Sequence, residues 1–335
     1  MSGSKQAAWV TWARLALFAL PIAVLVFVPV YLIDPYSAFG PHSIVSASIR
    51  DNYRTRVNSV LFKVNSYALD PSPDIILGDS QLAQLPEDVI DRAAGRRISN
   101  MAYYGASLTE AMQTFWLAAA STHLRKVYFG GDFHLITMSP LENAQDRVTS
   151  SKRLLADKSQ YFIDHDVLEA TWAAARAQFF GLETDYAPQM SREEFWKLQL
   201  NTVVKSNAQM DPLVVADLRA IVDYCRTHGI QFVFVLPPQH SDVRRRIEQV
   251  GLHDAYESVM SQLQALAEVW DCDVDSEITT DQGQFTDPFH LTKEAAVRVA
   301  EDIWSDRSVY CRHLAWRGQQ EVAQAAAGRA VWARP

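Results

Sequence analysis

A serine stands where a short apolar run ends, at Gly78-Asp79-Ser80. The preceding residues, Asp74-Ile75-Ile76-Leu77, predict a buried strand, and a helical pattern resumes near Leu85. Ser80 is therefore expected at the carboxyl end of a parallel strand, where open α/β sheets bind their ligands. A hydroxyl there could act as a nucleophile, although a serine between a strand and a helix is also a common helix cap.

A histidine and an aspartate near the other end of the chain could activate that serine. They lie in the segment Thr286-Asp287-Pro288-Phe289-His290-Leu291-Thr292, just before a predicted helix. Acyl transfer to a serine needs a base that takes its proton, a group that orients the base, and donors that face the oxyanion. The same segment could instead be an ordinary helix start, in which Asp287 or Thr292 caps the helix at Lys293.

Three segments in this chain order resemble the SGNH (GDSL-type) serine hydrolases. They are Gly78-Asp79-Ser80, Asn100-Met101-Ala102-Tyr103-Tyr104-Gly105-Ala106-Ser107 and Asp287-Pro288-Phe289-His290. The resemblance implies that Ser80 is the nucleophile, that His290 is its base and that Asp287 orients the imidazole. It also implies that the backbone N–H groups of Ser80 and Gly105 contribute to an oxyanion hole.

The chain departs from this family after its third predicted strand. In Gly130-Gly131-Asp132-Phe133, an aspartate stands in place of the family's asparagine. An ionised carboxylate cannot donate a hydrogen bond, and losing one oxyanion donor costs about 3 kcal/mol of transition-state stabilisation. Three roles stay open for Asp132: it is protonated, it turns away to hold a neighbour such as His134, or it binds a polar part of the substrate. Asn100 could supply a donor from the adjacent strand.

Two further histidines, His134 and His240, follow predicted strands and are expected at the same edge of the sheet. Together with Asp132 and Asp287 they could be imagined as metal ligands, but no two of the four share a ligand-type helical spacing. We therefore predict no metal and no cofactor. We treat Asp132, His134 and His240 as candidates for contact with the substrate.

The composition excludes some classes of partner. The 335 residues carry a net charge of −8 and give an isoelectric point near 5.6, which argues against a nucleic-acid partner because phosphate binding needs a basic patch. The three cysteines, Cys225, Cys272 and Cys311, are widely spaced, so neither a disulfide framework nor a Cys-x-x-Cys metal site is predicted. One disulfide could form in an oxidising compartment.

The N-terminal segment predicts a membrane anchor. Residues 15–33 contain no charge, are bounded by Arg14 and Asp34, and are numerous enough to cross a membrane as a helix. Because Lys5 and Arg14 precede the run, the positive-inside rule places residues 1–14 in the cytoplasm and the rest in the periplasm or outside. The expectation is a single-pass inner-membrane protein. The alternative is a signal peptide with a weak cleavage site at Val45-Ser46-Ala47.

Short apolar strands alternate with helices over most of the remaining chain, which predicts a parallel sheet covered by helices on both faces. With the resemblance, this gives a three-layer αβα, flavodoxin-like domain over residues 71–312, after a juxtamembrane linker and helix at 34–70. The strand pattern lapses at about 139–212. We interpret that stretch as a helical insertion that forms a lid, part of a substrate groove or a plain cover for the sheet. Residues 313–335 predict a helical tail.

The resemblance implies a membrane-anchored serine esterase or O-acyltransferase. Anchored relatives act on cell-envelope or exported polysaccharides, adding or removing O-acetyl groups, often beside a membrane-bound O-acyltransferase. Hydrolysis and transfer both stay open, because either water or a sugar hydroxyl can attack an acyl-enzyme. The alternative is a non-catalytic component of an envelope polysaccharide complex with a compromised oxyanion hole. A nucleotide binder is disfavoured, because Gly78-Asp79-Ser80 has one glycine and an acidic residue where phosphate would lie.

Overall fold

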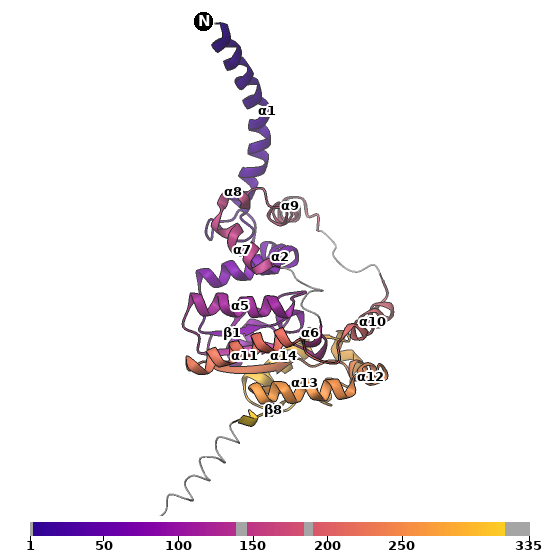
Figure 1. Cartoon of the computed structure of the whole chain (residues 1–335). Helices are drawn as coiled ribbons and strands as arrows, with labels where there is room; N and C mark the ends of the chain where they lie inside the picture. The colour runs from indigo at the N-terminus through magenta and orange to yellow at the C-terminus, as the bar shows by residue number, and fades with distance from the viewer. Residues whose placement is uncertain (1–2, 139–145, 184–189, 319–335) are drawn as a thin grey trace, which may run out of the picture. The chain divides into compact units, whose positions relative to one another are not determined.

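The chain folds as two compact units. The computed structural model describes residues 3–138, 146–183 and 190–318. One unit, here called the helical unit, consists of Met1–Leu69 and Arg147–Pro188, and the other, the α/β unit, consists of Asp70–Asp146 and Gln189–Pro335 (Figure 1). Each unit therefore combines two stretches that are separated in the sequence.

The α/β unit contains a six-stranded sheet in the order β2-β1-β3-β4-β5-β8. Strands β1 to β5 are parallel, and β8 pairs with β5 in the antiparallel direction. A separate two-stranded sheet pairs β6 with β7. The strands are β1 (Asp74–Leu77), β2 (Ser99–Asn100), β3 (Lys126–Gly130), β4 (Gln231–Leu236), β5 (Glu268–Asp271), β6 (Phe285–Asp287), β7 (His290–Leu291) and β8 (Arg312–Leu314).

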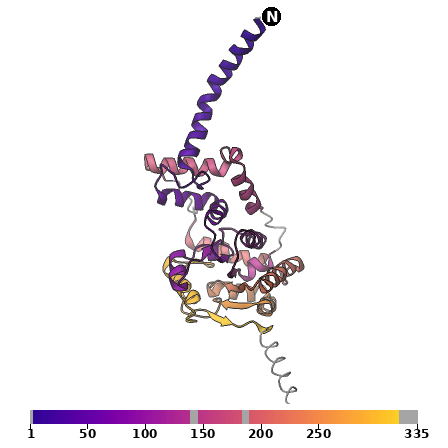
Figure 2. The same cartoon turned by 90° about the vertical axis from the view of Figure 1, so that its left-hand side faces the viewer.

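Helices cover both faces of the six-stranded sheet (Figures 1 and 2). Alternate residues of the strands, such as Ile76 and Val233, are buried in one cluster with α4 and α14, while α5 and α11 pack on β1 and β4 and on each other. This agrees with the predicted three-layer arrangement, in which parallel strands are apolar on both faces. The helices are α3 (Ser80–Ala83), α4 (Glu87–Ala94), α5 (Leu108–Ser121), α6 (Phe133–Thr137), α10 (Arg192–Leu200), η1 (Asn201–Lys205), α11 (Pro212–Thr227), α12 (Ser241–Gln249), α13 (His253–Leu266), η2 (Gln282–Gln284) and α14 (Lys293–Trp304).

The last parallel strand differs from the sequence pattern, which predicts a helix up to Trp270 and a strand at Cys272–Val274. Helix α13 instead ends at Leu266, and β5 begins at Glu268. Val269 and Trp270 are buried between β4 and β8, so pairing with two neighbours overrides the local helical pattern.

The helical unit contains α1 (Gly3–Ile33), α2 (Ala47–Leu69), α7 (Arg147–Ala156), α8 (Lys158–Tyr161) and α9 (His165–Phe180). Asp34 joins the end of α1 to the rest of this unit. Its carboxylate accepts the N–H groups of Ala38 at 2.8 Å and Phe39 at 2.7 Å, and the hydroxyl of Tyr161 at 2.8 Å. Burial raises the pKa of Asp34, although these hydrogen bonds oppose the rise.

Helix α1 includes residues 15–33, for which the sequence predicts a membrane span. Among the helices in the described part of the chain, none combines the length and the apolar character that crossing a membrane requires. The predicted transmembrane anchor is therefore not supported. At the end of the apolar run, Val30 and Ile33 instead lie in the core of the helical unit, with exposed fractions of 0% and 2%.

The predicted insertion at about 139–212 does not form one piece. Helices α7 to α9 belong to the helical unit, whereas α10 and η1 belong to the α/β unit. Residues 139–145 and 184–189 lie outside the described chain. The α/β unit begins at Asp70, and residues 147–183 group with Met1–Leu69 in the helical unit.

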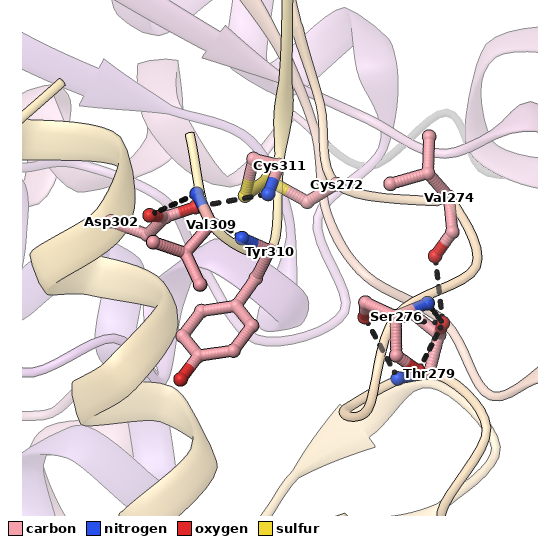
Figure 3. Close-up of a disulfide and its surroundings, with 8 residues drawn as sticks. All are labelled: Cys272, Val274, Ser276, Thr279, Asp302, Val309, Tyr310 and Cys311. Carbon is pink, nitrogen blue, oxygen red and sulfur yellow. Dashed lines mark hydrogen bonds between the residues drawn. A yellow bond between two sulfur atoms is a disulfide. The ribbon is translucent and has the colours of Figure 1, made fainter. Parts of the chain in front are cut away.

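A disulfide between Cys272 and Cys311 attaches the C-terminal segment to the sheet (Figure 3). Beside it, the carboxylate of Asp302 accepts the backbone N–H groups of Val309, Tyr310 and Cys311 at 2.8 to 2.9 Å. These contacts hold the loop that leads into β8. Of the predicted helical tail at 313–335, residues 313–314 belong instead to β8, residues 317–318 are helical, and the part from residue 319 onward lies outside the described chain.

We expect the double variant Cys272→Ala/Cys311→Ala to be less stable. The two cysteines are 39 residues apart, and closing a loop of this length in the unfolded chain is worth about 4 kcal/mol in the chain-entropy model. Urea unfolding of the oxidised protein, with and without dithiothreitol, measures the loss. The double variant should be insensitive to the reductant, and an unchanged wild-type midpoint on reduction would contradict a structural disulfide.

Candidate active site

Strand β1 and the short helix α3 position Ser80. Gly78, between them, has a φ of +148°, and a Cβ at this position would lie 2.9 Å from the carbonyl oxygen of Gly130. Only glycine therefore allows β1 to approach the end of β3 this closely. Asp79 follows as the N-cap of α3 and accepts the N–H of Gln81 at 3.0 Å. Ser80 is the first residue of α3 and is partly exposed.

The hairpin of β6 and β7 places His290 beside Ser80. Asp287 fixes the turn, because its Oδ1 accepts the N–H groups of Phe289 at 2.9 Å and His290 at 3.2 Å. The Nδ1 of His290 lies 2.8 Å from Asp287 Oδ2, and its Nε2 lies 2.8 Å from Ser80 Oγ. The structure thus brings together the three residues singled out in the sequence. Thr292, also as predicted, caps helix α14.

These contacts define the protonation pattern of His290. Its Nδ1–H donates to the acceptor-only carboxylate of Asp287, which leaves Nε2 free to accept the hydroxyl proton of Ser80. Burial is the largest single effect on the pKa of His290 and lowers it, but the hydrogen bond and charge of Asp287 act in the opposite direction. The charges of Asp79 and Asp132 add to the rise. The net pKa lies above the ordinary histidine value, so the surroundings stabilise the imidazolium that forms when Ser80 gives up its proton.

A cavity of about 190 Å³ opens in front of Ser80 and His290. Gly105, proposed from the sequence as an oxyanion donor, lies in its wall with a φ of +61°. The wall combines residues from five segments of the chain: Asp79, Ser80, Gln81, Gly105, Ala106, Asp132, His134, Leu135, Met138, Gln199, Thr202, Phe289 and His290. Apolar side chains thus stand close to the reacting groups, as an acyl group would require.

Both carboxylate oxygens of Asp132 accept hydrogen bonds, so this side chain is not a hydrogen-bond donor in the site. Its Oδ1 accepts the N–H of Leu135 at 2.7 Å and caps helix α6, and its Oδ2 accepts the side-chain amides of Gln81, at 2.9 Å, and Gln239. Desolvation and, next to it, the charge of Asp132 together raise the pKa of Asp79 to about 7. Of the roles left open by the sequence, Asp132 therefore holds neighbours, but these are Gln81 and Gln239, not His134.

The other predicted site residues fall into two groups. His134 lies in the cavity wall, where its Nδ1 is 2.9 Å from the hydroxyl of Ser206. Asn100 is not among the residues that line the cavity. Its side-chain amide donates to the carbonyl oxygen of Leu82 at 2.8 Å, so this amide is not placed as an oxyanion donor.

His240 is also absent from the cavity wall and is buried as the N-cap of α12, which corrects its prediction as a substrate contact. Its backbone N–H donates to the carbonyl oxygen of Pro288 at 2.9 Å and so supports the loop that carries His290. Burial lowers its pKa, and a neutral ring is consistent with its Nδ1 accepting the N–H of Asp242 at 3.2 Å.

Four glutamine and threonine residues were not foreseen at the site. Gln81 and Gln239 hold Asp132, while Gln199 and Thr202, from α10 and η1, reach the cavity wall. The positions of Gln81 and Gln239 in the sequence could have indicated them: Gln81 directly follows Ser80, and Gln239 follows the end of β4. Gln199 and Thr202 carry no motif, because only the fold of the inserted segment brings them to the sheet edge.

In the described residues, one group of three side chains could hold a metal ion. It consists of His165, Asp166 and Glu169 at the surface of α9, in the helical unit. None of these residues belongs to the cavity at Ser80. Exposed acidic groups of this kind are common without a metal, and the group has no bearing on the chemistry of Ser80.

We expect Asp132→Asn to lower the pKa of His290. The charge of Asp132 favours the imidazolium, so removing that charge makes the ring lose its proton at lower pH. Titration of the His290 Cε1–H signal by NMR, assigned with His290→Gln, measures the change. Asp223→Asn, which alters an exposed aspartate paired with Arg226, is the control and should leave the pKa unchanged. A raised or unaltered pKa in Asp132→Asn would refute this electrostatic role.

The chain was also compared with known proteins. No family model matches it, and no curated protein matches it either. It is similar to the structure of a candidate lipolytic protein of the G-D-S-L family from Desulfitobacterium hafniense, at 11% identity and a TM-score of 0.35, covering 69% of this chain and 96% of that one. It is also similar to a candidate platelet activating factor from Streptococcus pneumoniae, at 10% identity and a TM-score of 0.38, covering 78% and 97%. Likeness at this level of identity and TM-score does not establish a family for the chain.

Proposed function

We propose that this protein is a serine acyl-ester hydrolase in which Ser80, His290 and Asp287 form the catalytic triad. The observation that carries the proposal is the continuous pair of hydrogen bonds from Ser80 through His290 to Asp287. A serine with its base and orienting carboxylate in this geometry is an activated nucleophile. The adjoining cavity gives an acyl group access to it.

The reaction follows from the placement of these atoms. Ser80 Oγ attacks the ester carbonyl carbon while its proton passes to His290 Nε2. The imidazolium, held by Asp287, then protonates the leaving alcohol, and an acyl-enzyme remains on Ser80. Water attacks the acyl-enzyme and gives a proton to His290, and His290 returns that proton to Ser80 Oγ as the bond from Oγ to the acyl group breaks and the acid leaves. The N–H groups of Ser80 and Gly105 are the proposed donors to the oxyanion.

The size of the cavity supports a short acyl group as the substrate. A volume of about 190 Å³ equals that of roughly six water molecules in the liquid, which suits an acetyl or similar group better than a long hydrocarbon chain. The finer proposal is removal or transfer of O-acetyl groups on a polysaccharide of the cell envelope. Its support is the resemblance of the three sequence motifs, together with this small cavity.

We expect Ser80→Ala to reduce hydrolysis of p-nitrophenyl acetate by at least about 10⁴-fold, because no other hydroxyl replaces the nucleophile. Intact-mass analysis after treatment with a fluorophosphonate should show one adduct on the wild type and none on the variant. Ser258→Ala, an exposed serine on α13, is the matched control and should behave as wild type. A folded wild type that neither turns over ester nor takes the adduct would favour the non-catalytic alternative.

Asp287→Asn should lower kcat by about 10⁴-fold, since the amide no longer holds the tautomer in which His290 accepts at Nε2. Because wild-type Asp287 raises the pKa of His290, and the neutral ring is the active form, the wild-type rate should rise with pH through a pKa above the ordinary histidine value. The pH–rate profile of kcat/KM tests this directly. Asp275→Asn, an exposed aspartate outside the catalytic cavity, serves as the control, and equal rates in Asp287→Asn would remove Asp287 from the triad.

A further inference from the structure

The α/β unit contains a second cavity, of about 610 Å³, at the carboxyl end of β5. Its lining includes Tyr256, Met260 and Ser261 from α13, and Asp271 and Asp273 from the end of β5 and the residues after it. None of its lining residues is shared with the cavity at Ser80. The chemistry of this second cavity is therefore separate from that of the catalytic triad.

The disulfide fixes the polar wall of this cavity. Cys272 lies between Asp271 and Asp273, and its partner Cys311 directly precedes Arg312 (Figure 3 shows the disulfide). Arg312 donates to Asp271 Oδ2 at 2.7 Å, so the covalent link and this ion pair join the same two segments. Such a wall is rigid before any ligand arrives, which lowers the entropic cost of binding.

Three polar atoms in this wall have no hydrogen-bond partner among the described residues. They are Asp271 Oδ1, Asp273 Oδ1 and Arg244 Nε. The two carboxylate side chains are only 3% and 6% exposed. Tyr256 donates to the other oxygen of Asp273 at 2.9 Å, but Arg244 Nε lies 3.6 Å from Oδ1, where it forms an ion pair without a hydrogen bond. Buried polar groups are normally paired, so unpaired atoms in a cavity wall indicate a missing partner.

The chemistry of these atoms selects the class of ligand. A cation could pair with Asp271 and Asp273 but not with the N–H of Arg244, and an anion could pair only with Arg244. A hydroxyl group both donates and accepts, so a neutral ligand with several hydroxyls satisfies all three atoms. Burial raises the pKa of Asp273 to about 8, although Arg244 opposes the rise, and this further disfavours a cationic ligand. No group of three metal-binding side chains is found here within the described chain.

We propose that this cavity is a binding site for a neutral polyhydroxylated ligand, namely a sugar unit whose hydroxyls pair with Asp271, Asp273 and Arg244. Its apolar lining, which includes Met260 and Leu314, offers a surface for the C–H face of a sugar ring. The site does not depend on Ser80 or on acyl-ester chemistry.

Helix α6 separates the sugar site from the catalytic cavity. The ring of Phe133 lies 5.6 Å from that of Tyr256 in the sugar site, while Asp132 and His134, on either side of it, line the catalytic cavity. The two cavities are therefore neighbours along one edge of the sheet. This arrangement allows a saccharide to be held beside the triad without contacting it.

Calorimetric titration of the full chain with glucose, galactose and N-acetylglucosamine tests the proposal, with glucosamine and glucuronate as charged counterparts. At least one neutral sugar should bind saturably, and more tightly than either charged sugar. Asp271→Asn and Asp273→Asn should each weaken that binding about tenfold, while p-nitrophenyl acetate hydrolysis stays within twofold of wild type. Ser80→Ala should bind the sugar unchanged, so a failure of the hydrolase proposal would not affect this result.

A second pair of variants keeps the test decisive if an aspartate variant does not fold. Ser261→Trp places a bulky side chain in the cavity and should abolish sugar binding, whereas Gln262→Trp, next to it on the exposed face of α13, should not. The proposal is overturned if no neutral sugar binds, if a charged sugar binds more tightly, or if Ser261→Trp binds as well as wild type. Each of these outcomes would mean that the cavity is not a binding site for a neutral sugar.

Discussion

The hydrogen bond between Ser80 Oγ and His290 Nε2 joins residues 210 positions apart, and the functional interpretation depends on it. Neither partner reaches this geometry alone. Ser80 is directed by the turn at Gly78, where the close approach of Gly130 excludes any side chain. His290 is directed by its hairpin, in which Asp287 binds two backbone N–H groups as well as the imidazole. The same carboxylate therefore builds the loop and orients the base, so loop folding and catalytic geometry are linked.

Two carboxylates besides Asp287, those of Asp79 and Asp132, act on the pKa of His290. Asp79 and Asp132 both favour the imidazolium, which carries the proton between attack and departure of the leaving group. Asp132 cannot itself donate to the oxyanion, but Gln81 and Gln239 bind its carboxylate and hold it in place. In the proposed mechanism, the charge of Asp132 therefore acts on the imidazolium and not on the oxyanion.

The carboxyl edge of the parallel sheet organises both cavities. Strands β1, β3 and β4 end just before Ser80, Asp132 and Gln239, respectively. Strand β5 ends at the carboxylates of the proposed sugar site. Because the strands are parallel, all four ends lie at one edge, and the chain can place different chemistry side by side there. The disulfide at Cys272 stabilises the outer end of this edge, where β8 is the last strand. Extra residues from η1, such as Thr202, extend the wall of the catalytic cavity.

The amino-acid sequence by itself determined the central strands and singled out the three side chains of the proposed triad. Short apolar runs such as Asp74–Leu77 are set by local burial and turn residues, and Ser80, Asp287 and His290 belong to compact motifs. Tertiary structure alone decided what their neighbours do. The side chains of Asn100 and His240 could have lined the cavity, but each forms a hydrogen bond with a backbone group instead. Residues 15–33 form a helix, and the last residues of that helix are buried in the core of the helical unit. The physical reason is that these outcomes depend on contacts between segments far apart in the chain, which local patterns do not encode.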